Sequence, residues 1–321
     1  MNITKTKDMN KEQINRRNFI KKTSLLSVGG YVALSMSGVS TVFGNNPQLI
    51  PGAGIDIVAV KGGQPGAMFK KAIEAWGGMK SVVKPGQTVV VKPNIGWNVT
   101  PDRAANTNPE LIREIVKECV RVGAKEVYVM DHTADVWTKC YKNSGIEQAC
   151  KDGGGKMVPG NNERDFKTVT IPGAKRLKRT KVHDLILSSD VIINVPVLKH
   201  HASTKISLGM KNMMGVVWDR QWWHKNDLHQ CIADFTTYMV ADLTIVDAYA
   251  VMKRNDPMGV SVEDVVIQKA LLLGKDPVSL DVASARMFGK DPSEVGYIRL
   301  ATEMKIGNAD LASLNIQKIK L

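Results

Sequence analysis

The 321-residue chain lacks the short signatures of the commonest nucleotide-binding and hydrolytic sites. No G-x-G-x-x-G opens a helix after the first expected strand, and no G-x-x-x-x-G-K-[ST] occurs, so the ordinary phosphate cradles are not indicated. The absence of G-x-S-x-G disfavours a serine hydrolase, and the fixed zinc motif H-E-x-x-H is also missing. Any site must therefore be inferred from residues that the fold brings together.

Cysteine is scarce, with only Cys119, Cys140, Cys150 and Cys231 in the chain. None forms a C-x-x-C pair, so no iron–sulfur cluster or zinc ribbon is encoded in this chain. Cys140 and Cys150 are candidates for a disulfide in an oxidising compartment. Cys119 falls on the apolar face of an expected helix, which predicts a packed core thiol.

The first 44 residues have the features of an export signal. Arg16-Arg17-x-Phe19 precedes a weakly apolar run, residues 23–42, that is broken by glycine and serine and is therefore a poor permanent membrane span. We expect a twin-arginine signal peptide cleaved after Gly44, with a Sec signal or a tethered helix as alternatives. The chain is then exported to a periplasmic or extracytoplasmic location and meets the membrane only during export. The twin-arginine route carries folded proteins, often with a cofactor already inserted.

Positive charge is in excess along the chain. Residues 1–44 contribute +5 of the net charge of +13, so the remainder carries +8, much of it in residues 175–181. We interpret that run as a solvated loop, although a basic balance also attracts anionic substrates or a membrane surface. Nucleic acid is not an expected partner, because aromatic and basic residues do not interleave as base-stacking surfaces require.

Hydrophobic periodicity predicts an α/β domain over residues 45–321, with a mostly parallel, doubly wound sheet and helices on both faces. Expected strands span residues 55–60, 88–91, 126–130, 190–195, 243–246, 265–273 and 314–319, with a possible edge strand at 167–171. Expected helices span residues 66–76, 109–122, 144–151, 229–240, 278–288 and 293–304. Residues 153–181 form a small inserted lobe, and the aromatic, polar segment 218–229 is expected to be an ordered loop.

Polar residues follow several of these strands at the point where each is expected to end. They are Lys92 and Asn94, Asp131 and His132, Lys199 and His200, and Asp247. The carboxyl ends of parallel strands share one rim of a sheet, and ligands of α/β proteins bind there. The alternative is that these residues are solvated starts of loops. We favour a shared binding site, with Lys92, Asn94, Asn212 and Asp247 as substrate-binding residues.

Residues 194–215 carry the densest set of chemical groups. Lys199, Lys205 and Lys211 fall within thirteen residues, beside the paired imidazoles of His200 and His201. Lysines in this density suit a carboxylate or phosphate, so an anionic small molecule is the expected ligand. His201, His200, Lys199 and Lys211 are the candidate catalytic residues, with a histidine transferring a proton or binding metal.

A metal ion is a possible cofactor, with His200, His201 and Asp131 as candidate ligands. A second possible set is His224 with Asp219, Asp227 and His229, although their spacing matches no fixed metal signature. Asp276 is expected to cap the following helix. Asp281, one turn further on, is a candidate partner for a lysine or a metal ligand.

Several of these residues resemble the motifs of domain-of-unknown-function family 362, in the family's order and over nearly the whole mature chain. The matching motifs are Lys92-Pro93-Asn94, Thr107-Asn108-Pro109, residues 123–131, Val195-Pro196-x-Leu198-Lys199-x-His201, Lys211-Asn212-x-x-Gly215, Val246-Asp247-Ala248 and Asp276-Pro277-Val278-x-x-Asp281. The family pattern Leu-Lys-x-His shifts the preferred histidine from His200 to His201. The chain departs from the family at residues 251–259, where charged residues replace a glycine-rich stretch.

Some members of that family carry an iron–sulfur segment, so the resemblance implies redox chemistry in which a partner protein holds the cluster. Three hypotheses follow. The first is an exported redox or metal-assisted enzyme acting on an anionic small molecule. The second is a non-catalytic extracytoplasmic protein that binds a metal or an anion. The third is an accessory protein to a redox partner.

Overall fold

The structure is a computed structural model that describes residues 54–255 and 258–321, all within one compact unit. The expected signal peptide, residues 1–44, lies outside the described residues. Among the helices of the described ranges, none is long and apolar enough to cross a bilayer.

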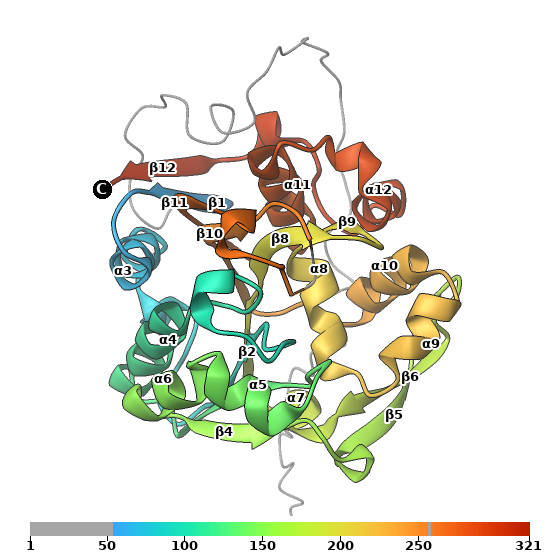
Figure 1. The fold of residues 1–321 in the computed structure, drawn as a ribbon, viewed down its shortest axis with the longest axis horizontal. Helices are drawn as coiled ribbons and strands as arrows, with labels where there is room; N and C mark the ends of the chain where they lie inside the picture. Colours follow the sequence, from blue (N-terminus) through green and yellow to red (C-terminus); the bar gives the residue numbers. More distant parts are fainter. Residues whose placement is uncertain (1–53, 256–257) are drawn as a thin grey trace, which may run out of the picture. The chain divides into compact units, whose positions relative to one another are not determined.

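The main element is a ten-stranded mixed sheet that contains both termini of the described chain (Figure 1). Its strand order is β12-β1-β11-β10-β7-β2-β3-β4, with β8 paired to β10 and β9. Its strands are β1 (Ile57–Lys61), β2 (Thr88–Pro93), β3 (Glu126–Asp131), β4 (Lys156–Pro159), β7 (Val191–Val195), β8 (Val197–His201), β9 (Lys205–Ser207), β10 (Leu243–Met252), β11 (Val265–Gly274) and β12 (Ile316–Lys320). A separate two-stranded sheet pairs β5 (Phe166–Thr170) with β6 (Arg179–His183).

Helices cover both faces of the main sheet. They are α3 (Pro65–Ala75), α4 (Pro109–Arg121), α5 (Trp137–Asn143), α6 (Ile146–Asp152), α7 (Asp184–Ser188), α8 (Gly209–Asn212), α9 (Arg220–Lys225), α10 (Leu228–Tyr238), α11 (Pro277–Phe288) and α12 (Gly296–Glu303). The first four of these helices pack in one hydrophobic cluster, and α7 to α12 pack in the other. Side chains alternate between the two clusters along each strand: Val58 and Val60 of β1 join the first, whereas Ile57 and Ala59 join the second.

The expected mostly parallel α/β sheet is confirmed, and one central strand runs the other way. Strands β4, β3, β2, β7, β10 and β8 pair in parallel, as do β1 and β12. Strand β11 is antiparallel to both β1 and β10. β10 and β11 are joined without a crossover helix, and such a connection returns the chain antiparallel.

The inserted lobe differs from its prediction. The expected edge strand at residues 167–171 is not in the main sheet, because β5 pairs with β6 with Phe166 opposite His183. Strand β6 also takes up part of the basic run that was expected to be a loop. One edge of the main sheet is instead β4, whose four residues are too few to show a strand periodicity.

Two further expectations were wrong. Residues 218–229 are not a loop, because they contain α9 and the start of α10, whose first turns are capped by the carboxylates of Asp219 and Asp227. The strand of residues 190–195 does not simply end at Pro196. The chain continues as β8, which pairs with the second half of β10, so Lys199, His200 and His201 lie in a strand. Pro196 only interrupts the ladder, since its ring nitrogen has no hydrogen to donate.

The four cysteines are buried free thiols, so Cys140 and Cys150 do not form the disulfide considered from the sequence. Cys119 is fully buried in the cluster around α4, as predicted. Burial raises the pKa of Cys150 to about 12, which leaves this thiol protonated and unreactive at neutral pH.

The contribution of the α11 cap to the stability of this fold can be tested directly. The Asp276 carboxylate accepts hydrogen bonds from the backbone N–H of Val278 at 2.8 Å and of Asn308 at 2.6 Å, and from the Ser279 hydroxyl at 2.9 Å. We expect Asp276→Ala to lower the free energy of unfolding by about 2 kcal/mol in urea titrations. Asp291→Ala, which uncaps only a short exposed turn, is the control and should cost less. Equal losses for the two variants would contradict this role.

Candidate functional site

A buried ion pair joins the ends of two neighbouring strands. Lys92 of β2 and Asp131 of β3 are 0% and 3% exposed, and Nζ lies 2.8 Å from Oδ1. Lys92 Nζ also donates to the Pro93 carbonyl at 2.6 Å, and Asp131 Oδ2 accepts the Ile95 N–H at 2.7 Å. Burial lowers the pKa of Lys92, and the charge of Asp131 opposes that shift. A buried pair of this kind is stable only because its remaining hydrogen bonds are made as well.

Amide side chains extend this pair into a buried polar network of Lys92, Asn94, Asp131, Lys199 and Asn212. Asn212 Oδ1 accepts from Lys92 Nζ at 3.3 Å and from Asn94 Nδ2 at 3.1 Å. Asn94 Oδ1 in turn accepts from Lys199 Nζ at 3.1 Å, and this ammonium also donates to the Ala105 carbonyl at 2.5 Å. Among the described residues, the network contains the two ammonium groups of Lys92 and Lys199 and the carboxylate of Asp131.

Glycine is required where the chain passes over this network. A Cβ on Gly215 would lie 1.8 Å from Asp131 Oδ1 and 2.6 Å from Lys92 Nζ. The Gly215 carbonyl also accepts the His132 N–H at 2.8 Å. The glycine of the Lys211-Asn212-x-x-Gly215 motif thus allows the backbone to approach the ion pair closely.

A second group, the cationic cluster, lies on the β8–β9 hairpin, α8 and α9. Its members are Lys199, His200, His201, Lys211 and His224. Burial, followed by the charges of Lys211, Lys199, His224 and His200, lowers the pKa of His201 to about 2. The backbone N–H of Ser203 donates to His201 Nδ1 at 3.2 Å, so the neutral ring carries its proton on Nε2. His200, His201, Lys199 and Lys211 were predicted together as catalytic candidates, and the structure adds His224 to the residues that act on His201 electrostatically.

Three other predicted residues have structural contacts instead. Both oxygens of Asp247 accept backbone N–H groups, from Asn108 at 2.8 Å and Tyr249 at 3.1 Å, so this carboxyl holds the start of α4. Burial raises the pKa of Asp247 to about 6. Asp281 accepts the N–H groups that open α8, and Lys205 forms an exposed ion pair with Glu294 at 3.1 Å.

The predicted metal ligands are not assembled. Within the described parts of the chain, no three His, Cys, Asp or Glu side chains form a group that could hold a metal ion. Asp131 already accepts hydrogen bonds on both oxygens, from Lys92 and Ile95. Neither His200 and His201 with Asp131, nor His224 with Asp219, Asp227 and His229, forms a ready ligand set. A metal cofactor stays a prediction from the sequence.

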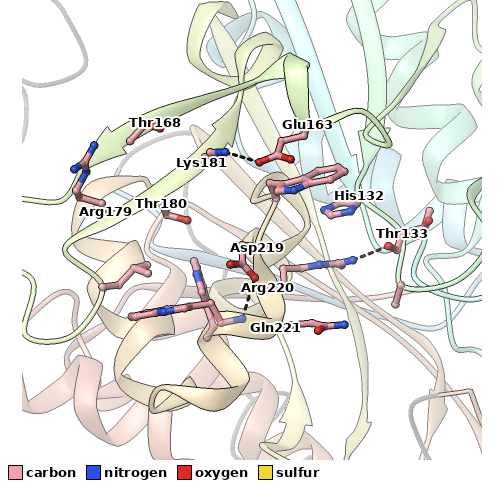
Figure 2. A pocket seen from close by; sticks show the side chains of 15 residues that line it. His132, Thr133, Glu163, Thr168, Arg179, Thr180, Lys181, Asp219, Arg220 and Gln221 are labelled. Atoms are coloured by element: carbon pink, nitrogen blue, oxygen red, sulfur yellow. Dashed lines mark hydrogen bonds and ion pairs between the residues drawn. The ribbon is translucent and has the colours of Figure 1, made fainter.

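The structure also contains a cavity of about 660 Å³ that the sequence analysis did not identify (Figure 2). It is lined by His132, Thr133, Ala134, Glu163, Thr168, Leu177, Arg179, Thr180, Lys181, Trp218, Asp219, Arg220, Gln221, Trp222 and Trp223. These residues come from the end of β3, from the β5–β6 sheet and from the start of α9. The signal available in the sequence was the unusual aromatic composition of residues 218–229. The separation in sequence between that segment and the β5–β6 lobe concealed their contact.

The close approach of Gly215 to the ion pair gives a first test. We expect Gly215→Ala to displace Asp131 or Lys92 and to lower the free energy of unfolding by on the order of 3 kcal/mol, because a buried pair is disrupted. Gly96→Ala is the matched control, since the nearest atom to its new Cβ is 3.9 Å away. A cooperative urea transition with an unchanged midpoint for Gly215→Ala would show that the network tolerates the methyl group.

The buried carboxyl of Asp281 gives a second test, through the pH dependence of stability. Burial raises its pKa to about 7, above its value of about 4 in the unfolded chain. Since the folded state then holds the extra proton, the contribution of this group is fully present below about pH 4 and is lost as the pH rises to 7. The free energy of unfolding of the unmodified chain, relative to Asp281→Asn, should therefore fall over this range. A constant difference between pH 4 and 7 would contradict the raised pKa.

Comparison with known proteins adds one relative and one solved structure. The chain is 25% identical over 243 residues to the Thylakoid-associated protein sll1697 of Synechocystis, and the match covers 71% of each chain. The lactate racemase apoprotein of Thermoanaerobacterium thermosaccharolyticum aligns with 12% identity and a TM-score of 0.47. That alignment covers 77% of this chain but only 60% of the racemase chain.

The family comparison covers most of the described sheet and both groups of site residues. The model of the family described as "Domain of unknown function (DUF362)" matches residues 89–286, from β2 to α11. The matched span contains the whole buried polar network and the whole cationic cluster. The chain belongs to the DUF362 family.

Proposed function

We propose that the chain is an exported enzyme that acts on an anionic small molecule bound at the cationic cluster. The observation that supports this proposal is the convergence of two lysines and three histidines from β8, α8 and α9 on one another. Export is proposed from the twin-arginine motif at Arg16-Arg17.

The members of the cationic cluster repel one another electrostatically. His201 is held neutral by burial and by the surrounding lysines and histidines, and the pKa of His224 is lowered by burial, Lys211 and Arg220. A bound carboxylate or phosphate would offset this repulsion and would be held by charge-assisted hydrogen bonds.

The geometry gives each residue a distinct role. Lys199 is fixed by Asn94 and the Ala105 carbonyl, so its ammonium is preorganised, whereas Lys211 is half-buried on α8. His201 Nε2–H is a neutral donor beside these charges. Fixed donors of this kind stabilise negative charge that develops on an oxygen of the substrate during reaction. Asn212 and Asp281 are positioning residues, because they hold α8 in place.

The alternative is a non-catalytic protein that captures an anion or a metal outside the cytoplasm. The cationic cluster would bind the ligand in this case as well. Chemical conversion of the ligand distinguishes the enzyme from the capture protein. An accessory role beside a redox partner is a further alternative, in which the exposed basic residues of the β5–β6 lobe would contact an acidic surface and association would weaken with salt.

The proposal is tested by binding and by conversion. Calorimetric titration with inorganic phosphate and with citrate should show binding that weakens roughly tenfold in Lys211→Ala, as expected for loss of a charge-assisted hydrogen bond. Because a bound anion raises the pKa of His201, affinity corrected for the protonation of phosphate or citrate itself should increase as the pH falls, and His201→Gln should lose this remaining dependence. Lys225→Ala, an equal loss of charge on an exposed part of α9, is the control.

Conversion is measured by incubating the chain with a mixture of 2-hydroxy acids, 2-oxo acids and phosphate esters and following products by mass spectrometry. A product that disappears in Lys211→Ala and His201→Gln supports an enzyme. Tight binding with no conversion favours the capture protein. If Lys225→Ala weakens binding as much as Lys211→Ala does, the cationic cluster is not the binding site.

A further inference from the structure

The cavity beside α9 has a rigid aromatic wall. The Trp218 ring stacks on His132 with 4.9 Å between ring centroids and 4° between planes, and Phe166 lies 5.2 Å from the Trp218 ring. The Trp218 backbone N–H donates to the Lys181 carbonyl at 3.0 Å, which ties this residue to β6. Trp222, also in the lining, keeps 38% of its surface exposed. An exposed indole in a cavity is a favourable surface for a planar apolar ring.

Arg220 brings a positive charge to this cavity, and no carboxylate of residues 54–255 and 258–321 forms an ion pair with it. The one hydrogen bond of its guanidinium within these ranges is from Nη2 to the Thr133 carbonyl at 2.6 Å (Figure 2). Burial lowers the pKa of Arg220, and the charge of Asp131, which is itself bonded to Lys92, only partly opposes the shift. A half-buried guanidinium with spare donors favours an anion in the adjoining space.

A further feature of the lining points to a ligand. The indole nitrogen of Trp223 is buried and has no hydrogen-bond partner, although this side chain is only 1% exposed and lines the cavity. By contrast, Lys181 and Asp219 are already engaged, with Glu163 and with the N–H of Trp222 respectively.

We propose that this cavity is a second binding site, for a ligand that has a planar aromatic ring and carries an anionic group. The ring packs against the Trp218 and Trp222 indoles. The anion lies against the guanidinium group of Arg220. A volume of about 660 Å³ is in the usual range of small-molecule sites and leaves room for more than one ring.

This site is separate from the cationic cluster. None of the five cluster residues lines the cavity. The two sites influence each other electrostatically, because the charge of Arg220 lowers the pKa of both His132 and His224. An anion bound at Arg220 would therefore favour protonation of His224 and so alter the cluster. This inference does not depend on what the cluster binds.

The experiment is calorimetric titration of the full chain with 2-naphthyl phosphate, with 2-naphthol and with inorganic phosphate as matched probes. We expect 2-naphthyl phosphate to bind at least tenfold more tightly than either probe, since ring and anion both contribute. Arg220→Gln should weaken it by tenfold or more, and Trp222→Ala by severalfold. Because Arg220 also supports Thr133, Trp222→Ala, at a side chain that is 38% exposed, tests the site without disturbing the fold. Arg179→Gln, on the far side of the cavity from Arg220 (Figure 2), should weaken binding less than Arg220→Gln does.

Two controls locate the binding. Arg164→Gln removes an equal charge from an exposed turn outside the cavity and should leave the affinity unchanged. Lys211→Ala with His201→Gln disables the cationic cluster and should also leave it within about twofold. Loss of binding in that double variant, equal affinity for 2-naphthol, or no effect of Arg220→Gln or of Trp222→Ala would each overturn the inference.

Discussion

The buried pair of Lys92 and Asp131 is the constraint on which the site depends. It couples the ends of β2 and β3 in a region from which water is excluded, so every group around it must satisfy its hydrogen bonds within the protein. That requirement explains the amides of Asn94 and Asn212 and the absence of a side chain at Gly215. These residues form much of the pattern shared with the DUF362 family, and their contacts give the pattern a physical reason.

Basic side chains gather around this pair. Lys199 belongs both to the buried network and to the cationic cluster, and Arg220 lies within electrostatic reach of Lys92, His132 and His224. Placing these charges near one another at low dielectric destabilises the folded protein. A bound anion would offset this repulsion, and that expectation is the basis of both proposals. The fold supplies two neighbouring receptive surfaces: the β8–β9 hairpin with α8, and the cavity beside α9.

Much of the sheet was predictable because its strands are short, β-branched and end in polar residues. Strands β1, β2, β3, β7 and β11 were expected within a few residues, and the helix after Asn108-Pro109 began as predicted. Strand β10 was expected to end at residue 246 but continues to Met252, so Asp247 lies within the strand and not after its end. The failures have identifiable causes. β8 was missed because Pro196 looks like a strand end, and α9 was missed because its aromatic residues show no helical periodicity. The short helix is stabilised by its cap at Asp219 and by burial of Trp223, neither of which is a periodic signal.

The sequence by itself determined the fold class and most of the buried strands, because these follow from local periodicity. It also determined which polar residues lie near the ends of neighbouring strands, at one rim of the sheet. Only the tertiary structure decided their roles. It paired Lys92 with Asp131, assigned Asp247 and Asp281 to backbone N–H groups, and grouped His201 with Lys211 and His224. It also brought residues 218–223 against the β5–β6 lobe to form the cavity. Contacts between residues distant in sequence depend on how helices and strands pack, and local sequence carries no record of that packing.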